Sequence, residues 1–190
     1  MVPRAETAHW LAASVALALA LLLLSEVIVG SDVYRRRRWR AYLWPSVALA
    51  AGVLLWVIAV FSTFSTMHLL AHAVWAQAAM VAGAVELAVV RGKLESPRWT
   101  LVTAGAFLVT GAAFLIHEQN SLLYSRAAFL HHALGWTLVV AAIFPVGRAL
   151  RPRQPAWSAG FAMTFVVVAV LLYADRDAAE IFGRFGVGRP

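Results

Sequence analysis

Six histidines are the residues of this chain best suited to chemistry, and four of them occur at close spacing. His68 and His72 form the sequence His-Leu-Leu-Ala-His, in which the four-residue spacing places both imidazoles on one face of a helix. His131 and His132 are adjacent, so they point about 100° apart around a helix and at most one is expected to face the same site. Because imidazole is a common metal ligand, the spacing predicts a metal or haem site.

Three other side chains adjoin these histidines. His117 and Glu118 close an apolar segment, where the carboxylate would orient an imidazole or bind the ion itself. Met67 precedes His68 and supplies a thioether, a ligand that favours Cu(I). This donor set suits copper or zinc better than Mg²⁺ or Ca²⁺, which prefer oxygen. The candidate metal ligands are therefore Met67, His68, His72, His117, Glu118, His131 and His132. His9 is expected to be interfacial.

The elements that must position these residues are membrane-spanning helices. The chain is 62% apolar and 13% charged, and residues 41–85 carry no formal charge. A helix crosses the hydrocarbon core in about 20 residues, so this stretch is long enough for two crossings. The apolar segments are 9–30, 42–62, 67–90, 99–116, 127–147 and 156–173. The sequence thus predicts an all-α, polytopic membrane helix bundle of six spans over 1–174, with a short extracytoplasmic tail over 175–190. Five spans with one re-entrant segment is the alternative.

Basic residues are divided unevenly between the two ends of these segments. Eleven follow the first, third and fifth segments: Arg35, Arg36, Arg37, Arg38, Arg40, Arg91, Lys93, Arg98, Arg148, Arg151 and Arg153. Five remain on the other side: Arg4, Arg126, Arg176, Arg184 and Arg189. Because basic loops stay in the cytoplasm, we expect both termini outside a cytoplasmic (inner) membrane. The histidines would then share the outer, periplasmic-facing end.

Several other functions have no support in the sequence. Without cysteine the chain has no thiolate nucleophile or Cys-based metal site. The formal charge of +7 lies in clusters between apolar segments, which topology explains without nucleic acid. No Ser/His/Asp arrangement or glycine-rich phosphate loop predicts catalysis. The expected partners are the lipid bilayer, a metal ion and other membrane or periplasmic proteins.

Residues 67–148 carry a family resemblance. The motifs are Met67-His68-Leu69-Leu70-Ala71-His72 with Trp75, His117-Glu118-Gln119, and His131-His132 with Gly135. In these the chain resembles the bacterial copper-resistance D family of multi-helix membrane proteins, which handle copper at the outer face of the cytoplasmic membrane. The resemblance implies copper binding or passage rather than catalysis.

Two other functions remain open. In a b-type haem cytochrome, His72 together with His131 or His132 would be the axial ligands, and Arg126 would meet a propionate. In a structural subunit of a larger membrane complex, the histidines would only hydrogen-bond to neighbouring helices.

Two expectations concern packing rather than the site. Glycines inside spans should let helices approach closely. They are Gly52, Gly83, Gly105, Gly111 and Gly135. Glu86 is expected to associate with the Arg35 to Arg40 cluster or with Arg91.

Overall fold

The chain folds as an all-helical bundle. A computed structural model describes residues 5–30, 38–61, 66–116 and 125–174, and the regular elements in those ranges are all helices. The α-helices are α1 (Ala5–Val29), α3 (Leu43–Phe61), α4 (Thr66–Val90), α5 (Leu101–Ile116), α6 (Ser125–Ala141), α7 (Ile143–Leu150) and α8 (Pro155–Ala174). Short 3-10 helices, η1 (Arg38–Tyr42) and η2 (Pro97–Thr100), precede α3 and α5. The predicted tail over 175–190 lies outside the described residues.

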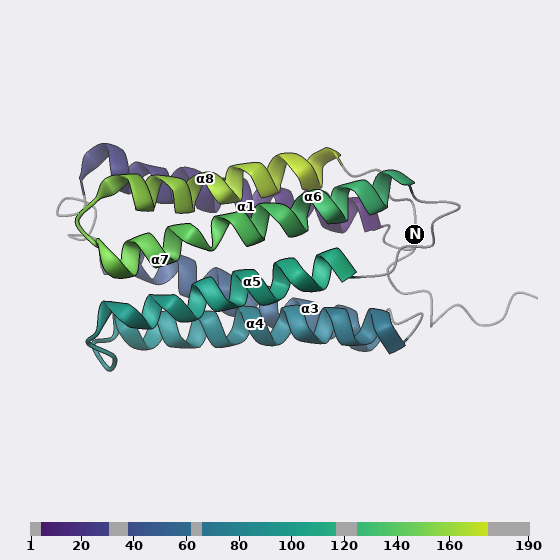
Figure 1. The fold of residues 1–190 in the computed structure, drawn as a ribbon, viewed down its shortest axis with the longest axis horizontal. Helices are drawn as coiled ribbons and strands as arrows, with labels where there is room; N and C mark the ends of the chain where they lie inside the picture. Colours follow the sequence, from purple (N-terminus) through teal and green to yellow (C-terminus); the bar gives the residue numbers. More distant parts are fainter. Residues whose placement is uncertain (1–4, 31–37, 62–65, 117–124, 175–190) are drawn as a thin grey trace, which may run out of the picture.

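Within the described residues, six helical stretches are long and apolar enough to cross a membrane, as the sequence predicts. Helices α6 and α7 together make one of these stretches, and η1 and η2 extend the stretches that contain α3 and α5. Helix α1 packs along α8 and α3 packs along α4, while α5 contacts both α4 and α6. Helices α6 and α7 join α5 to α8 (Figure 1). The chain is therefore a multi-pass membrane protein.

Glycines bring two pairs of helices into backbone contact. A Cβ built on Gly111 would lie 2.8 Å from the carbonyl oxygen of Gly135, so these residues set the α5–α6 approach. Gly52 and Gly83 do the same between α3 and α4, against Met80 and Leu49 respectively. The expectation for Gly105 is wrong, because a Cβ there meets nothing within 4 Å.

The fifth span is interrupted, a feature that the apolar pattern of the sequence does not predict. Helix α6 ends at Ala141 and α7 begins at Ile143. Pro145 explains the break, because proline has no N–H to donate to the carbonyl of Ala141 and its ring crowds that carbonyl. The same span ends at Leu150, just before Pro152, since the residue preceding a proline disfavours helix.

One end of the bundle combines an aromatic cluster with the basic side chains. Trp44 of α3 packs edge-on against Phe161 of α8, with ring centroids 5.2 Å apart, and also contacts Phe107 and Phe165. Eight described basic residues belong to helix ends and turns at this end: Arg38, Arg40, Arg91, Lys93, Arg98, Arg148, Arg151 and Arg153. Arg126 belongs to the first turn of α6, at the opposite end. The basic residues that the sequence assigns to one side of the membrane thus gather at one end of the bundle.

Candidate functional site

The histidine-bearing helix ends lie together at the end of the bundle opposite the basic cluster. Helix α4 begins at Thr66, α5 finishes at Ile116 and α6 begins at Ser125, all at the end near the N-terminus (Figure 1). His68 and His72 both belong to α4, which is continuous through that region. Their backbone positions are therefore one helical turn apart, as their spacing predicts.

Four rings connect α4, α5 and α6 at this level. His72 lies 4.7 Å, centroid to centroid, from Trp75 one turn along α4. Trp75, which is 5% exposed, stacks on Phe114 of α5 at 4.1 Å with planes 20° apart. Phe114 in turn lies 5.5 Å from His131 of α6. His72 thus contacts the buried ring of Trp75, and His131 contacts the half-buried ring of Phe114 stacked on it.

His132 faces a different direction from His131. Its side chain is exposed, and its Nδ1 lies 2.7 Å from the carbonyl oxygen of Ala128 in the preceding turn. A carbonyl only accepts, so Nδ1 carries the proton that it donates, and Nε2 is the nitrogen left to bind a metal. Of the adjacent pair, only His131 turns toward α5, in keeping with their 100° angular separation.

The side chains of the other predicted ligands lie outside the part of the chain that the structure describes. His117 and Glu118 lie outside the described residues, as do the side chains of Met67, His68 and Arg126. Among the residues that are described, no group of three His, Cys, Asp or Glu side chains comes together to hold a metal ion. The structure links His72 to His131 only through Trp75 and Phe114, and the ligand set remains a prediction.

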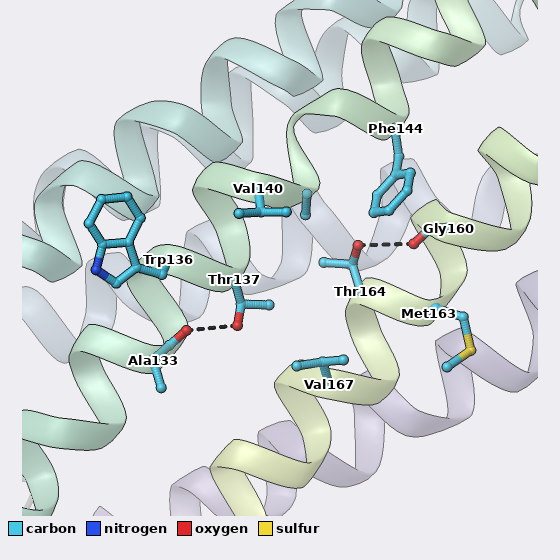
Figure 2. Close-up of a pocket in the computed structure, with 10 residues that line it drawn as sticks. Ala133, Trp136, Thr137, Val140, Phe144, Gly160, Met163, Thr164 and Val167 are labelled. Carbon is cyan, nitrogen blue, oxygen red and sulfur yellow. Dashed lines mark hydrogen bonds between the residues drawn. The ribbon is translucent and has the colours of Figure 1, made fainter.

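A cavity of about 400 Å³ lies between α6, α7 and α8, and no histidine is among its lining residues (Figure 2). Its lining is Ala133, Trp136, Thr137, Val140, Ala141, Phe144, Gly160, Met163, Thr164 and Val167. The hydroxyl of Thr137 donates to the carbonyl of Ala133, and the hydroxyl of Thr164 donates to that of Gly160, each within its own helix. The cavity is therefore apolar and offers a haem no axial histidine.

A buried polar pair was not foreseen from the sequence. The hydroxyl of Thr103 in α5 donates to Oε1 of Glu86 in α4 at 2.7 Å, and both side chains are buried. Glu86 therefore bonds to a neutral hydroxyl on the next helix. Of the arginines that were expected to accompany it, Arg35, Arg36 and Arg37 lie outside the described residues. The sequence signal for this pair is the position of Thr103 in the first turn of α5. Because α5 runs antiparallel to α4, that turn lies beside the last turns of α4, where Glu86 is located.

The site therefore consists of imidazoles from two helices around an aromatic pair, at the end of a six-span bundle. Comparison of the chain with models of protein families, with curated proteins and with solved structures finds no match.

Proposed function

We propose that the histidine-bearing end of the bundle binds a copper ion, as part of copper handling or passage across the membrane. The observation that carries the proposal is the contact of His72 and His131 with one aromatic pair, Trp75 and Phe114. His72 contacts Trp75 and His131 contacts Phe114, so α4 and α6, which each pack on α5, carry their imidazoles at the same end of the bundle. The same helix end carries His68 one turn before His72, preceded by Met67.

The aromatic pair gives such a site properties that a copper centre needs. Packed rings limit the rotamers of the imidazoles that contact them, which lowers the entropy lost on binding. An apolar shell also controls solvent access and the local dielectric around a metal. Imidazole and thioether ligands select copper over the hard cations Mg²⁺ and Ca²⁺. Together these features favour copper handling over a purely structural role for the histidines.

Copper titration of the full-length protein in detergent, purified without added metal, tests the proposal. The wild type should bind copper with an affinity that His72→Ala lowers by more than the 10- to 100-fold typical of a lost outer-shell partner. His131→Ala should resemble His72→Ala, whereas His132→Ala and His9→Ala should retain most of the affinity. His9 is the matched control because it is a histidine of α1, outside the α4–α5–α6 group.

An optical spectrum of the same preparation separates copper from haem. A Soret band in the wild type, lost in His72→Ala, would replace the proposal by the cytochrome alternative. Copper affinity that is equal in all four variants would show that the histidines are structural.

A further inference from the structure

The apolar cavity between α6, α7 and α8 opens on the side of the bundle that faces the membrane. Trp136 and Val140 on one wall are 59% and 63% exposed, and Met163 on the other is 45% exposed. The lining along α6 and α7 extends from Ala133 to Phe144, which corresponds to roughly 16 Å at the rise of a helix. One leaflet of the hydrocarbon core, half of about 30 Å, has nearly the same depth. The groove therefore has the length of one acyl chain.

Small side chains create this groove. Gly160, Thr164 and Ala133 lie where two helices would otherwise fill the space with larger side chains (Figure 2). Phe144 closes one end by packing against Gly160, where even a Cβ would collide with its ring. The groove thus has a closed end near the first turn of α7 and remains open along its side.

A basic turn lies beyond that closed end. Arg151, Pro152, Arg153 and Gln154 connect α7 to α8. Arg151 and Arg153 are exposed, and no carboxylate among the described residues forms a salt bridge with either. Gly160 lies about 8 Å along α8 from Pro155, the first residue after this turn. Arg148 adds a third positive charge, with its guanidinium carbon 4.8 Å from the ring centroid of Phe161.

We propose that the groove and the turn together bind one anionic phospholipid. Its phosphate lies at Arg151 and Arg153, and one acyl chain occupies the groove beside Val140 and Met163. The order of the features is that of a lipid: charge at the membrane surface, and then an apolar groove in which Val140 and Met163 lie about 15 Å from the basic turn, within the length of one acyl chain. Basic pockets between membrane helices bind anionic head groups in this way. A helix of a second copy would not require a basic turn beyond the end of the groove.

The head-group part of the proposal is tested by lipid titration of the full-length protein, followed by native mass spectrometry at low ionic strength. Phosphatidylglycerol should bind more tightly than phosphatidylcholine with the same acyl chains. Each basic side chain near a membrane surface strengthens anionic-lipid binding roughly fivefold, so the double variant Arg151→Gln/Arg153→Gln should weaken phosphatidylglycerol about 30-fold. Arg91→Gln/Lys93→Gln is the matched control, because it removes two equally exposed charges from another turn at the same end.

The acyl-chain part is tested by filling the groove. Val140→Trp should reduce binding of both lipids, whereas Val53→Trp, on the exposed face of α3 outside the groove, should not. Equal losses in the two charge variants would show diffuse electrostatic attraction and overturn the proposed site. Lipid binding that Val140→Trp leaves unchanged would also overturn the proposal. So would a dimer that Val140→Trp abolishes and phosphatidylglycerol does not alter, because that result would assign the groove to a second copy of the chain.

Discussion

Glu86 shows how a carboxyl group is accommodated within an apolar span. Its side chain is 6% exposed, and the hydroxyl of Thr103 supplies a hydrogen bond from the neighbouring helix. A buried acceptor that loses its partner costs about 1–3 kcal/mol, whereas hydrogen bonds between membrane helices average about 0.6 kcal/mol. The larger cost should apply here, because Glu86 is enclosed by protein and water cannot replace the lost hydrogen bond.

Thr103→Val should therefore lower the free energy of unfolding by about 1–2 kcal/mol. Thr137→Val is the matched control, because the Thr137 hydroxyl bonds only to the carbonyl of Ala133 in its own helix, and its loss should have little effect. Unfolding of both variants in detergent, followed by circular dichroism, makes the comparison. Equal effects of the two substitutions would contradict a specific role for the interhelical bond.

Proton competition gives a second prediction at the level of single residues. Only a neutral imidazole binds a metal, and the ordinary pKa of histidine is about 6.5. Lowering the pH from 7.5 to 5.5 should therefore weaken copper binding about tenfold for each ligating imidazole, and about 100-fold for two. Copper titrations at the two pH values measure this, and residual binding by His72→Ala should depend less on pH. A pH-independent affinity in the wild type would exclude imidazole ligands.

At the scale of the helices, α5 contains a close contact and an open position only six residues apart. A Cβ at Gly111 would meet the Gly135 carbonyl oxygen and Val139 Cγ2, each at 2.8 Å, whereas a Cβ at Gly105 would meet nothing within 4 Å. The two glycines therefore differ in packing while sharing the same helix. Substituting each with alanine separates interhelical contact from helix propensity.

Gly111→Ala should destabilise the bundle by about 1–3 kcal/mol, because α5 and α6 must move apart. Gly105→Ala should be neutral or stabilising by up to about 1 kcal/mol, because alanine is the better helix former. Thermal unfolding in detergent compares them. Gly111→Ala should also weaken copper binding, since the Phe114–His131 contact crosses the same helix pair. Equal stability of the two variants would show that the α5–α6 approach adjusts without cost.

For the whole molecule, the distribution of charge predicts orientation. The described basic residues gather at the end formed by η1, the α4–η2 turn and the α7–α8 turn, and basic ends remain cytoplasmic. The first residue of α1 and the last of α8 both lie at the other end, as an even number of spans requires. A periplasmic alkaline phosphatase fused after Pro190 should therefore be active, and a green fluorescent protein fused there should be dark. The reverse result would place the histidines at the cytoplasmic face.

The sequence by itself determined the spans and the level of the histidines. Hydropathy located each segment to within a few residues, because a bilayer demands a long apolar helix whatever its neighbours. Alternation of direction then places the starts of α4 and α6 beside the end of α5. That His72 and His131 share one end of the bundle therefore follows from topology alone, whichever helices are in contact.

Only the tertiary structure decided which side chains meet. Thr103 bonds to Glu86, Phe114 joins Trp75 to His131, and Gly105 packs against nothing, although none of these differs in pattern from its neighbours in the sequence. Helices in a bilayer are apolar on nearly every face, so hydrophobic periodicity does not distinguish the lipid-facing side from the packed side. Close van der Waals fit and single hydrogen bonds make that choice, and both depend on the rotation of each helix against its neighbour.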